Sequence, residues 1–212
     1  MQETAELEAY SHIRERILRG RFAADSLISQ DQIARDLNMS RIPVRDALRR
    51  LAADGLVTIR SNRRAVVTKL SWPEVREIFE IRAALEELAA REAAKNLTAS
   101  ALNELQIISE YLERYSFDSD KWVVRHEEFH DFVAASSGRP RLRTELRRLR
   151  ELVVPYFRIY SSSHGNAELP RSGHVDLVSA MTSEDAANVG KRFSEHVLTA
   201  INEIEPIMKS LS

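Results

Sequence analysis

Residues 28–60 read ISQDQIARDLNMSRIPVRDALRRLAADGLVTIR, and this stretch decides the fold of the N-terminal part of the chain. Ser29 is placed to cap a short helix, which ends at a tight turn around Asn38. Ser40 opens a second helix, and Gly55 ends it. The pattern predicts a helix–turn–helix, a motif whose second helix lies in the major groove of DNA.

The second of these helices presents basic residues on the face opposite its apolar residues. Arginine binds guanine O6 and N7 bidentately, and a serine at a helix start can bind phosphate. The expected DNA contacts on this helix are Ser40, Arg41, Arg45 and Arg49.

A hairpin follows, with short strands expected at 56–59 and 65–68 and a basic link between them. Arg63 in this link could reach a neighbouring phosphate or the minor groove. With a first helix over 5–19, the order of elements is that of a winged helix. The alternative is an ordinary helical hairpin whose arginines are merely solvated.

Composition and charge agree with a nucleic-acid-binding module at the N-terminus joined to a second part of different character. Residues 1–70 carry 13 Lys and Arg against 9 Asp and Glu, whereas the 212-residue chain has a net charge of −1. The absence of cysteine excludes a disulfide scaffold, a thiolate zinc finger and cysteine catalysis. No leader and no apolar run of about 18 residues is present, so we expect a cytoplasmic protein without a membrane partner.

After residue 70 the pattern is helical only. The low content of Gly and Pro, 6 of each, favours long helices. The fold class expected is mainly α: a winged helix-turn-helix domain at 1–70 and an all-helical bundle at 71–212. Helices are expected at 71–95, 99–114, 119–135, 140–161, 169–181 and 183–209.

Four histidines fall on apolar stripes of these helices. His126 and His130 are four residues apart and project together, and His174 and His196 each lie on a stripe of a later helix. A single such histidine is usually a satisfied core residue. Four converging imidazoles would be costly without a partner, whereas a divalent metal accepts a lone pair from each.

The same residues fit the zinc-protease pattern H-E-x-x-H. In that alternative Glu127 is the general base of a hydrolase and Glu151 could be the third ligand. The extension H-x-x-G-x-x-H is absent, because Val133 stands where Gly is needed. A hydrolase would also leave His174, His196 and the winged helix unexplained.

Arg82 lies on an inward apolar stripe, where it either pairs with a carboxylate such as Glu86 or grips the carboxylate of a ligand. Tyr156 and Tyr160 share another inward stripe and either pack in the core or line the same cavity.

Residues 9–70 resemble the winged helix of the GntR family of bacterial transcription regulators. The resemblance rests on Ser40-Arg41-x-Pro43-Val44-Arg45-x-Ala47-Leu48-x-x-Leu51 and on Gly55-Leu56-Val57. It implies that Arg41 and Arg45 contact DNA. Ile42 stands where the family usually has Thr, Arg64 where the wing usually has Gly, and residues 22–25 lack the usual Pro-Gly turn.

The helical remainder resembles the FadR-like branch of that family, with an FCD ligand domain. Many FCD domains bind a metal through Asp-x-x-x-His and two later histidines, which implies His130, His174 and His196 as ligands, with His126 in place of the Asp. Four neutral ligands favour zinc, nickel or copper over manganese. The resemblance also places an arginine in the effector cavity, at Arg82.

Together the sequence patterns and the family resemblance predict a metal-containing repressor, not an enzyme. It would bind a palindromic operator in double-stranded DNA as a homodimer, since one recognition helix reads too few bases. A divalent metal, zinc first and nickel second, and a small organic acid would complete its sensor site.

Overall fold

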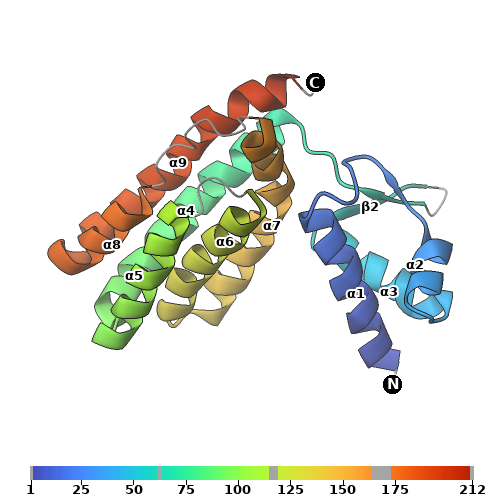
Figure 1. The fold of residues 1–212 in the computed structure, drawn as a ribbon, viewed down its shortest axis with the longest axis horizontal. Helices are drawn as coiled ribbons and strands as arrows, with labels where there is room; N and C mark the ends of the chain where they lie inside the picture. Colours follow the sequence, from blue (N-terminus) through green and yellow to red (C-terminus); the bar gives the residue numbers. More distant parts are fainter. Residues whose placement is uncertain (1, 62–63, 115–118, 164–172, 211–212) are drawn as a thin grey trace. The chain divides into compact units, whose positions relative to one another are not determined.

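The computed structural model describes residues 2–61, 64–114, 119–163 and 173–210. The chain divides into two compact units, Met1–Leu70 and Ser71–Ser212 (Figure 1). Each unit is described by itself below.

The first unit is a small helical domain with a three-stranded antiparallel sheet in the order β1-β3-β2. The helix–turn–helix consists of α2 and α3, and β2 and β3 form the hairpin that follows. The elements are α1 (Gln2–Leu18), β1 (Leu27–Ile28), α2 (Gln30–Asp36), α3 (Arg41–Ala53), β2 (Val57–Ile59) and β3 (Ala65–Val67).

Local sequence explains the turns of this unit. Asn38 adopts a φ of 50° between α2 and α3, a conformation that asparagine tolerates better than most residues. Gly55 adopts a φ of 88° directly after α3, so the predicted glycine stop is confirmed. The sequence did not predict β1, whose two residues pair with Val66 and Ala65 of β3.

The second unit is an all-helical bundle. Its elements are α4 (Trp72–Asn96), α5 (Ala99–Arg114), α6 (Ser119–Ser136), α7 (Pro140–Ser163), α8 (His174–Ser183) and α9 (Ala186–Ser210). None of the helices that the structure describes could cross a lipid bilayer.

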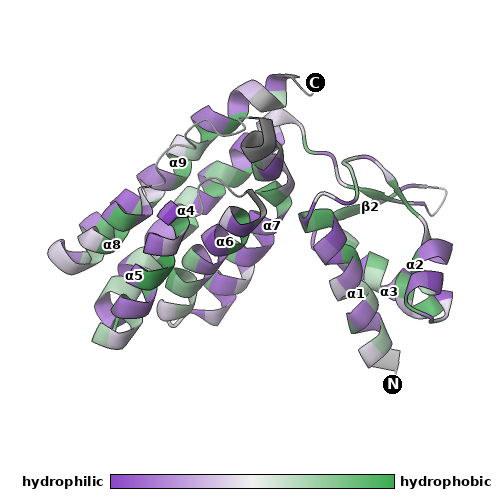
Figure 2. Cartoon of the chain, viewed as in Figure 1, coloured by the Kyte–Doolittle hydropathy of each residue, from purple (hydrophilic) through white to green (hydrophobic). Residues whose placement is uncertain are grey.

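Helix α4 organises the bundle, because it packs against α6, α7 and α9. Figure 2 shows hydrophobic residues where the helices face one another and hydrophilic residues on the outer faces. Phe129, Val133 and Phe193 belong to a core cluster that also includes residues of α4, α5 and α8. The side chains that form the candidate site project into this bundle from α4, α6, α7, α8 and α9.

Helix α9 approaches α4 closely at Gly190. A Cβ atom at this position would lie 2.8 Å from the backbone oxygen of Glu87 and 3.2 Å from the Cβ of Arg91. Only a glycine allows this approach without a shift of one helix.

The predicted start of the last helix at Ser183 is wrong. Ser183 ends α8, and α9 begins at Ala186. Asp185 caps α9, since its Oδ1 accepts hydrogen bonds from the backbone of Ala187 at 2.9 Å and of Asn188 at 3.0 Å. The preceding helix, predicted from residue 169, is described from His174 onward, and residues 169–172 lie outside the described part of the chain.

Candidate metal centre and DNA-binding face

Helix α3 presents Arg41, Arg45 and Arg49 to solvent, as its amphipathic spacing requires. Arg50 is also exposed but is bound to the first helix, since its guanidinium lies 4.4 Å from the ring centroid of Tyr10 and pairs with Glu6. The three other arginines therefore define the face of α3 that is free of α1. Ser40 caps α3 without a side-chain hydrogen bond to it.

Nearby carboxylates neutralise this face in part. Arg41 pairs with Asp31 of α2, and Asp46 lies 3.4 Å from Arg49 and 3.8 Å from Arg45. These pairs are exposed, so each contributes little to stability. DNA phosphates or base edges can replace them at small cost.

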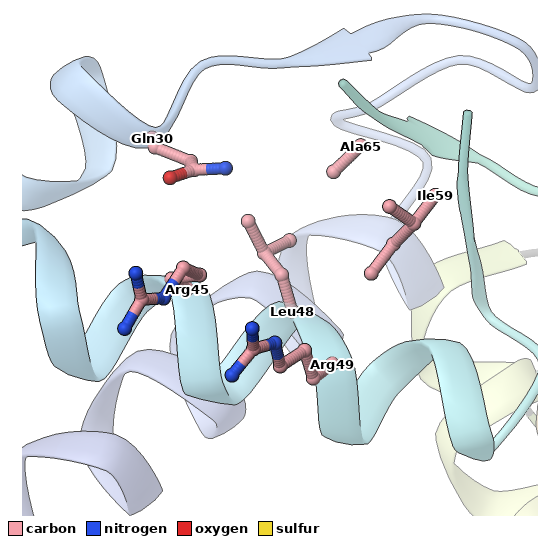
Figure 3. A pocket seen from close by; sticks show the side chains of 6 residues that line it. All are labelled: Gln30, Arg45, Leu48, Arg49, Ile59 and Ala65. Atoms are coloured by element: carbon pink, nitrogen blue, oxygen red, sulfur yellow. The ribbon is translucent and has the colours of Figure 1, made fainter. Parts of the chain in front are cut away.

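A groove with a volume of about 340 Å³ lies between α3 and the hairpin (Figure 3). Its lining combines two arginines and an apolar residue of α3 with apolar residues of the sheet and one polar residue of α2: Arg45, Arg49, Leu48, Ile59, Ala65 and Gln30. Arg63, the predicted contact at the hairpin tip, lies outside the described residues. Arg60, which directly follows β2 where the hairpin loop begins, is engaged by Asp25 at 2.5 Å.

In the second unit, the structure brings the four predicted histidines together. The imidazoles of His126, His130, His174 and His196 each place a nitrogen so that all four nitrogens lie within 4.8 Å of one another. The first three side chains are buried, and His196 is partly buried. They come from α6, α8 and α9, so the cluster exists only when the bundle is folded.

The arrangement fits a divalent metal. The Nε2 atoms of His130 and His174 are 3.4 Å apart, close to the separation of about 3.3 Å for two nitrogens on one tetrahedral zinc with bonds of about 2.0–2.1 Å. Among the residues that the structure describes, the buried Nδ1 atom of His174 has no hydrogen-bond partner. Each imidazole can give an ion only one of its nitrogens, so the close pair of Nε2 atoms is what ligation would explain, and Nδ1 of His174 would stay outside the coordination sphere.

Glu86 of α4 orients one of the four rings. Its Oε2 lies 2.8 Å from Nδ1 of His130, and both side chains are buried. The carboxylate fixes the tautomer in which Nδ1–H donates, which leaves the lone pair of Nε2 turned toward the other histidines. Carboxylates play this role behind metal-bound histidines.

Burial favours the neutral form of His126, His174 and His196. Burial, together with the neighbouring imidazoles, lowers the pKa of His126 to about 4 and that of His196 to about 3. The pKa of His174 falls well below its ordinary value for the same reasons. Neutral imidazole is the form that binds metals, so the site is prepared for a cation at neutral pH.

Arg82 is 2% exposed and donates through Nη2 to Glu86 Oε1 at 3.2 Å, one turn further along α4. Its Nε is buried and has no hydrogen-bond partner within the described part of the chain. Arg82 is therefore bound to a carboxylate of the chain and still retains an unused donor. Tyr156 is buried on α7, and the side chain of Tyr160 lies outside the described residues.

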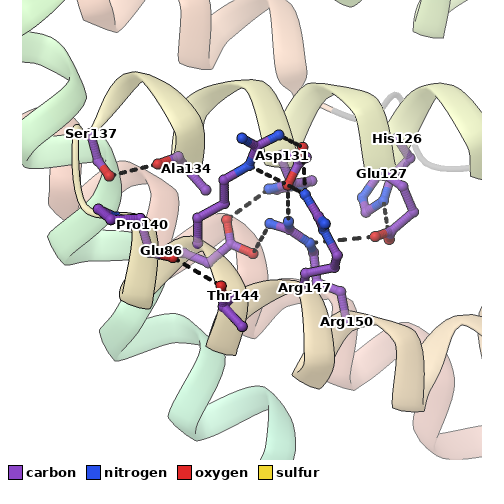
Figure 4. A network of polar contacts seen from close by, with 12 residues as sticks. Glu86, His126, Glu127, Asp131, Ala134, Ser137, Pro140, Thr144, Arg147 and Arg150 are labelled. Atoms are coloured by element: carbon purple, nitrogen blue, oxygen red, sulfur yellow. Dashed lines mark hydrogen bonds and ion pairs between the residues drawn. The ribbon is translucent and has the colours of Figure 1, made fainter. Parts of the chain in front are cut away.

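Sequence reasoning missed Arg150, a second buried arginine, which is 1% exposed (Figure 4). Its nitrogens lie 3.6 Å from Glu86, 3.4 Å from Glu127 and 3.5 Å from Asp131. The signal was available, since Arg150 follows Leu146 by four residues and precedes Val153 by three on the inward stripe of α7. Arg150 thus links the carboxylate behind His130 to the one beside His126.

Glu127 is a poor general base in this setting. Burial raises the pKa of Glu127, but the hydrogen bond with His126 and the charge of Arg150 outweigh it and bring the value to about 2. Among the described residues, the metal-capable group consists of the four histidines and does not include Glu151. The geometry does not support the hydrolase alternative.

Trp122 covers one side of the cluster. Its indole stacks on the imidazole of His126, with ring centroids 4.7 Å apart and an interplanar angle of 25°. Both residues lie on α6, one turn apart. The stacking adds a fourth aromatic neighbour to the His126 ring, which also contacts His130, Phe157 and His174.

Comparison with known proteins agrees with both parts of this description. Residues 5–67 match the family "Bacterial regulatory proteins, gntR family", and residues 77–199 match the FCD domain. The chain is 27% identical to the HTH-type transcriptional repressor GlaR of Escherichia coli K12 over 95% of this chain and 96% of that protein. It is 25% identical to the repressor RspR of the same strain, over 97% of this chain and 91% of RspR.

Solved structures share the fold. E. coli McbR/YncC superposes with a TM-score of 0.84 at 22% identity, covering 95% of this chain and 97% of that one. A putative GntR regulator from Rhodococcus sp. RHA1 gives a TM-score of 0.75 at 19% identity over 99% of both chains.

The chain is a member of the GntR family of transcription regulators and carries an FCD ligand-binding domain. It is a DNA-binding regulator of transcription and not an enzyme. Regulators of this family respond to small-molecule effectors, and FCD domains often bind a metal, for which this chain has a cluster of histidines that could hold one.

Proposed function

We propose that this regulator is a repressor that senses a small carboxylate at a metal centre in its helical domain. The observation that carries the proposal is the convergence of four imidazoles beside two buried arginines, Arg82 and Arg150. His126, His130, His174 and His196 would hold the ion, zinc before nickel, and the ion would supply positive charge for an anionic effector.

Arg82 would hold the carboxylate of the effector. Its Nε has no partner among the described residues, and a guanidinium can serve two carboxylates from different edges of its fork. Tyr156 and Tyr160 would line the same cavity. Because Arg82 also contacts Glu86, an incoming acid would disturb the carboxylate that orients His130, which would couple the effector to the metal ligands.

On the DNA side, a homodimer would bind a palindromic operator with α3 of each copy in the major groove. Ser40, Arg41, Arg45 and Arg49 would make the contacts from this helix, and Arg63 would add one from the hairpin. Arg45→Ala is expected to cost about 1–3 kcal/mol of specific binding. Arg63→Ala should weaken binding to all DNA sequences evenly. It should also lower the slope of log affinity against log salt concentration by about one.

The metal part is tested by elemental analysis of the purified protein. We expect about one zinc-class ion per chain, and His130→Ala and His174→Ala should lose it. His12→Ala in α1 is the control, because it removes a histidine from the other unit. Full metal occupancy in both cluster variants would refute the site.

The sensor part is tested by operator titration with a panel of organic acids, in metal-loaded and chelated protein. Arg82→Lys keeps a positive charge beside Glu86 and removes the fork, so it should keep metal and unliganded DNA binding but lose the response. Arg76→Lys, on the exposed face of the same helix, should respond like the wild type. If every acid leaves the operator affinity of metal-loaded protein unchanged, the sensor proposal is wrong.

A further inference from the structure

The face of α3 that presents Arg41, Arg45 and Arg49 also presents an apolar residue, which is not expected on a purely charged, solvated surface. Ile42 is 50% exposed in the first turn of the helix. Helix α3 is described over its whole length, and its other large apolar residues, Val44, Leu48 and Leu51, are all buried. Ile42 is thus the one large apolar side chain that α3 presents to solvent.

Its neighbours place Ile42 among the expected base contacts. On a helix, residues three and seven positions apart lie on the same face, so Ile42 shares a stripe with Arg45 and Arg49. Arg41 precedes it directly. In a helix–turn–helix, the N-terminal residues of the second helix contact base edges.

We propose that Ile42 is a specificity-determining residue that selects thymine through its 5-methyl group. Isoleucine has no hydrogen-bond donor or acceptor, so it gains nothing from the amino or carbonyl groups of the other bases. A base with an amino group at this position would lose water there without gaining a partner. The methyl group of thymine is the apolar group that the major groove offers.

The proposal extends the DNA part of the proposed function and rests on the placement of α3 in the major groove. It predicts a T·A pair in each half-site next to the base that Arg45 contacts. Threonine at position 42, the usual residue in the family, keeps one methyl but adds a hydroxyl that can bond to several bases. Isoleucine is therefore expected to make the preference sharper.

The test uses the full-length protein and an operator obtained by selection from random DNA. Replacing thymine with deoxyuridine removes only the methyl group. For each half-site changed at this position, we expect binding to weaken about fourfold, the value that burial of one methyl-sized group at about 0.8 kcal/mol gives, and thus about 15-fold when both half-sites are changed. Ile42→Ser should bind the unmodified operator more weakly and should be insensitive to uridine at that position.

Two variants control for fold and side-chain size. Ile42→Val retains the methyl contact and should keep the sensitivity to uridine. Ile107→Ser removes an equally exposed isoleucine from α5 in the other unit and should behave like the wild type. Because both isoleucines are exposed, neither serine variant should change the melting temperature appreciably.

The outcomes separate this inference from the proposal on which it rests. If uridine changes wild-type affinity by less than twofold at every position while Arg45→Ala weakens binding, the role of Ile42 is refuted and the placement of α3 stands. If Ile42→Ser is as sensitive to uridine as the wild type, Ile42 does not read the methyl group. If Arg45→Ala has no effect, the placement of α3 itself fails.

Discussion

Glu86 joins residues that the sequence places far apart. It accepts a hydrogen bond from His130 of α6, another from Arg82 one turn earlier, and lies 3.6 Å from Arg150 of α7. Although burial raises the pKa of Glu86, His130 and the two arginines hold it well below its ordinary value. The carboxylate stays charged inside the bundle and fixes the imidazole that it faces.

Replacing Glu86 with glutamine tests this role. Gln keeps the shape and an acceptor for His130 but removes the charge, so Glu86→Gln should weaken zinc binding about 10–100-fold. Competition with a chromogenic chelator measures the affinity. Glu80→Gln, on the exposed face of the same helix, should leave it unchanged. Wild-type affinity in Glu86→Gln would mean that the carboxylate has no part in the site.

The neutral histidines predict a pH dependence for the metal-free protein. The pKa is about 4 for His126 and about 3 for His196 in the folded state, against about 6.5 in the unfolded chain. Between pH 6.5 and 4 the unfolded chain therefore binds more protons. Stability is lost as pH falls through this window, by up to about 1.4 kcal/mol per pH unit for each histidine.

Urea unfolding of chelated protein at pH 7, 6 and 5 checks this slope. His196→Gln should reduce the slope of the free energy of unfolding against pH by the equivalent of about one proton, because the unfolded variant has one fewer site to protonate. A free energy of unfolding that does not change from pH 7 to 5 would contradict the burial of these rings.

At the scale of elements, the contact of α4 with α9 holds together the helices that carry Glu86 and His196. Gly190 sets the distance between them. Alanine is usually better than glycine in a helix by about 1 kcal/mol, but at this position the added carbon would lie 2.8 Å from the oxygen of Glu87.

Gly190→Ala should therefore destabilise the protein by about 1–3 kcal/mol, the cost of overpacking, instead of stabilising it. Chemical denaturation measures the change. Lys191→Ala, at the next and exposed position, should shift stability by less than about 0.5 kcal/mol. A more stable Gly190→Ala would show that the two helices can separate at little cost.

Elements with local signals were predictable from the sequence, and those that depend on tertiary pairing were not. Ser71 and Glu74 form a capping contact of the kind that a serine followed three residues later by glutamate favours, with the Ser71 amide donating to Glu74 at 2.7 Å. Strand β1 is only two residues long and is an element only because β3 pairs with it. The start of α9 was misplaced because Asp185, not Ser183, caps the helix.

The residues of the candidate site were likewise predictable from the sequence only where the signal was local. Each histidine could be found from its position on an apolar stripe. The partner of His130 could not, because which carboxylate faces it depends on how α4 and α6 are rotated about their axes. Arg82 and Glu86 lie on one helix, and their pairing was one of the two interpretations of Arg82 that the sequence allowed. Arg150 was recognisable by its stripe, but its three carboxylate neighbours were not.

At the scale of the whole molecule, the candidate ligands all belong to the unit at residues 71–212. A metal that binds only the folded bundle stabilises that bundle by linkage. The effect of the metal should then differ between the two units, which hydrogen exchange can resolve element by element.

We expect zinc to slow exchange of backbone amides in α4, α6, α8 and α9, and to leave α1, α2 and α3 within about twofold of the metal-free rate. Mass spectrometry of peptic fragments provides the measurement. In the His130→Ala variant, mixed with the same zinc concentration, exchange should not slow in any of these helices. Equal protection of both units would place the bound metal elsewhere or spread its effect over the whole chain.

The stacking of Trp122 on His126 has an optical consequence. The chain has two tryptophans, so in a Trp72→Phe variant all indole emission comes from the ring that touches the cluster. Copper(II) and nickel(II) have partly filled d shells and quench such a ring at contact range, whereas zinc, with a filled shell, leaves it bright. The light from one side chain would therefore report, in a cuvette and without any label, which ion the histidines have taken up.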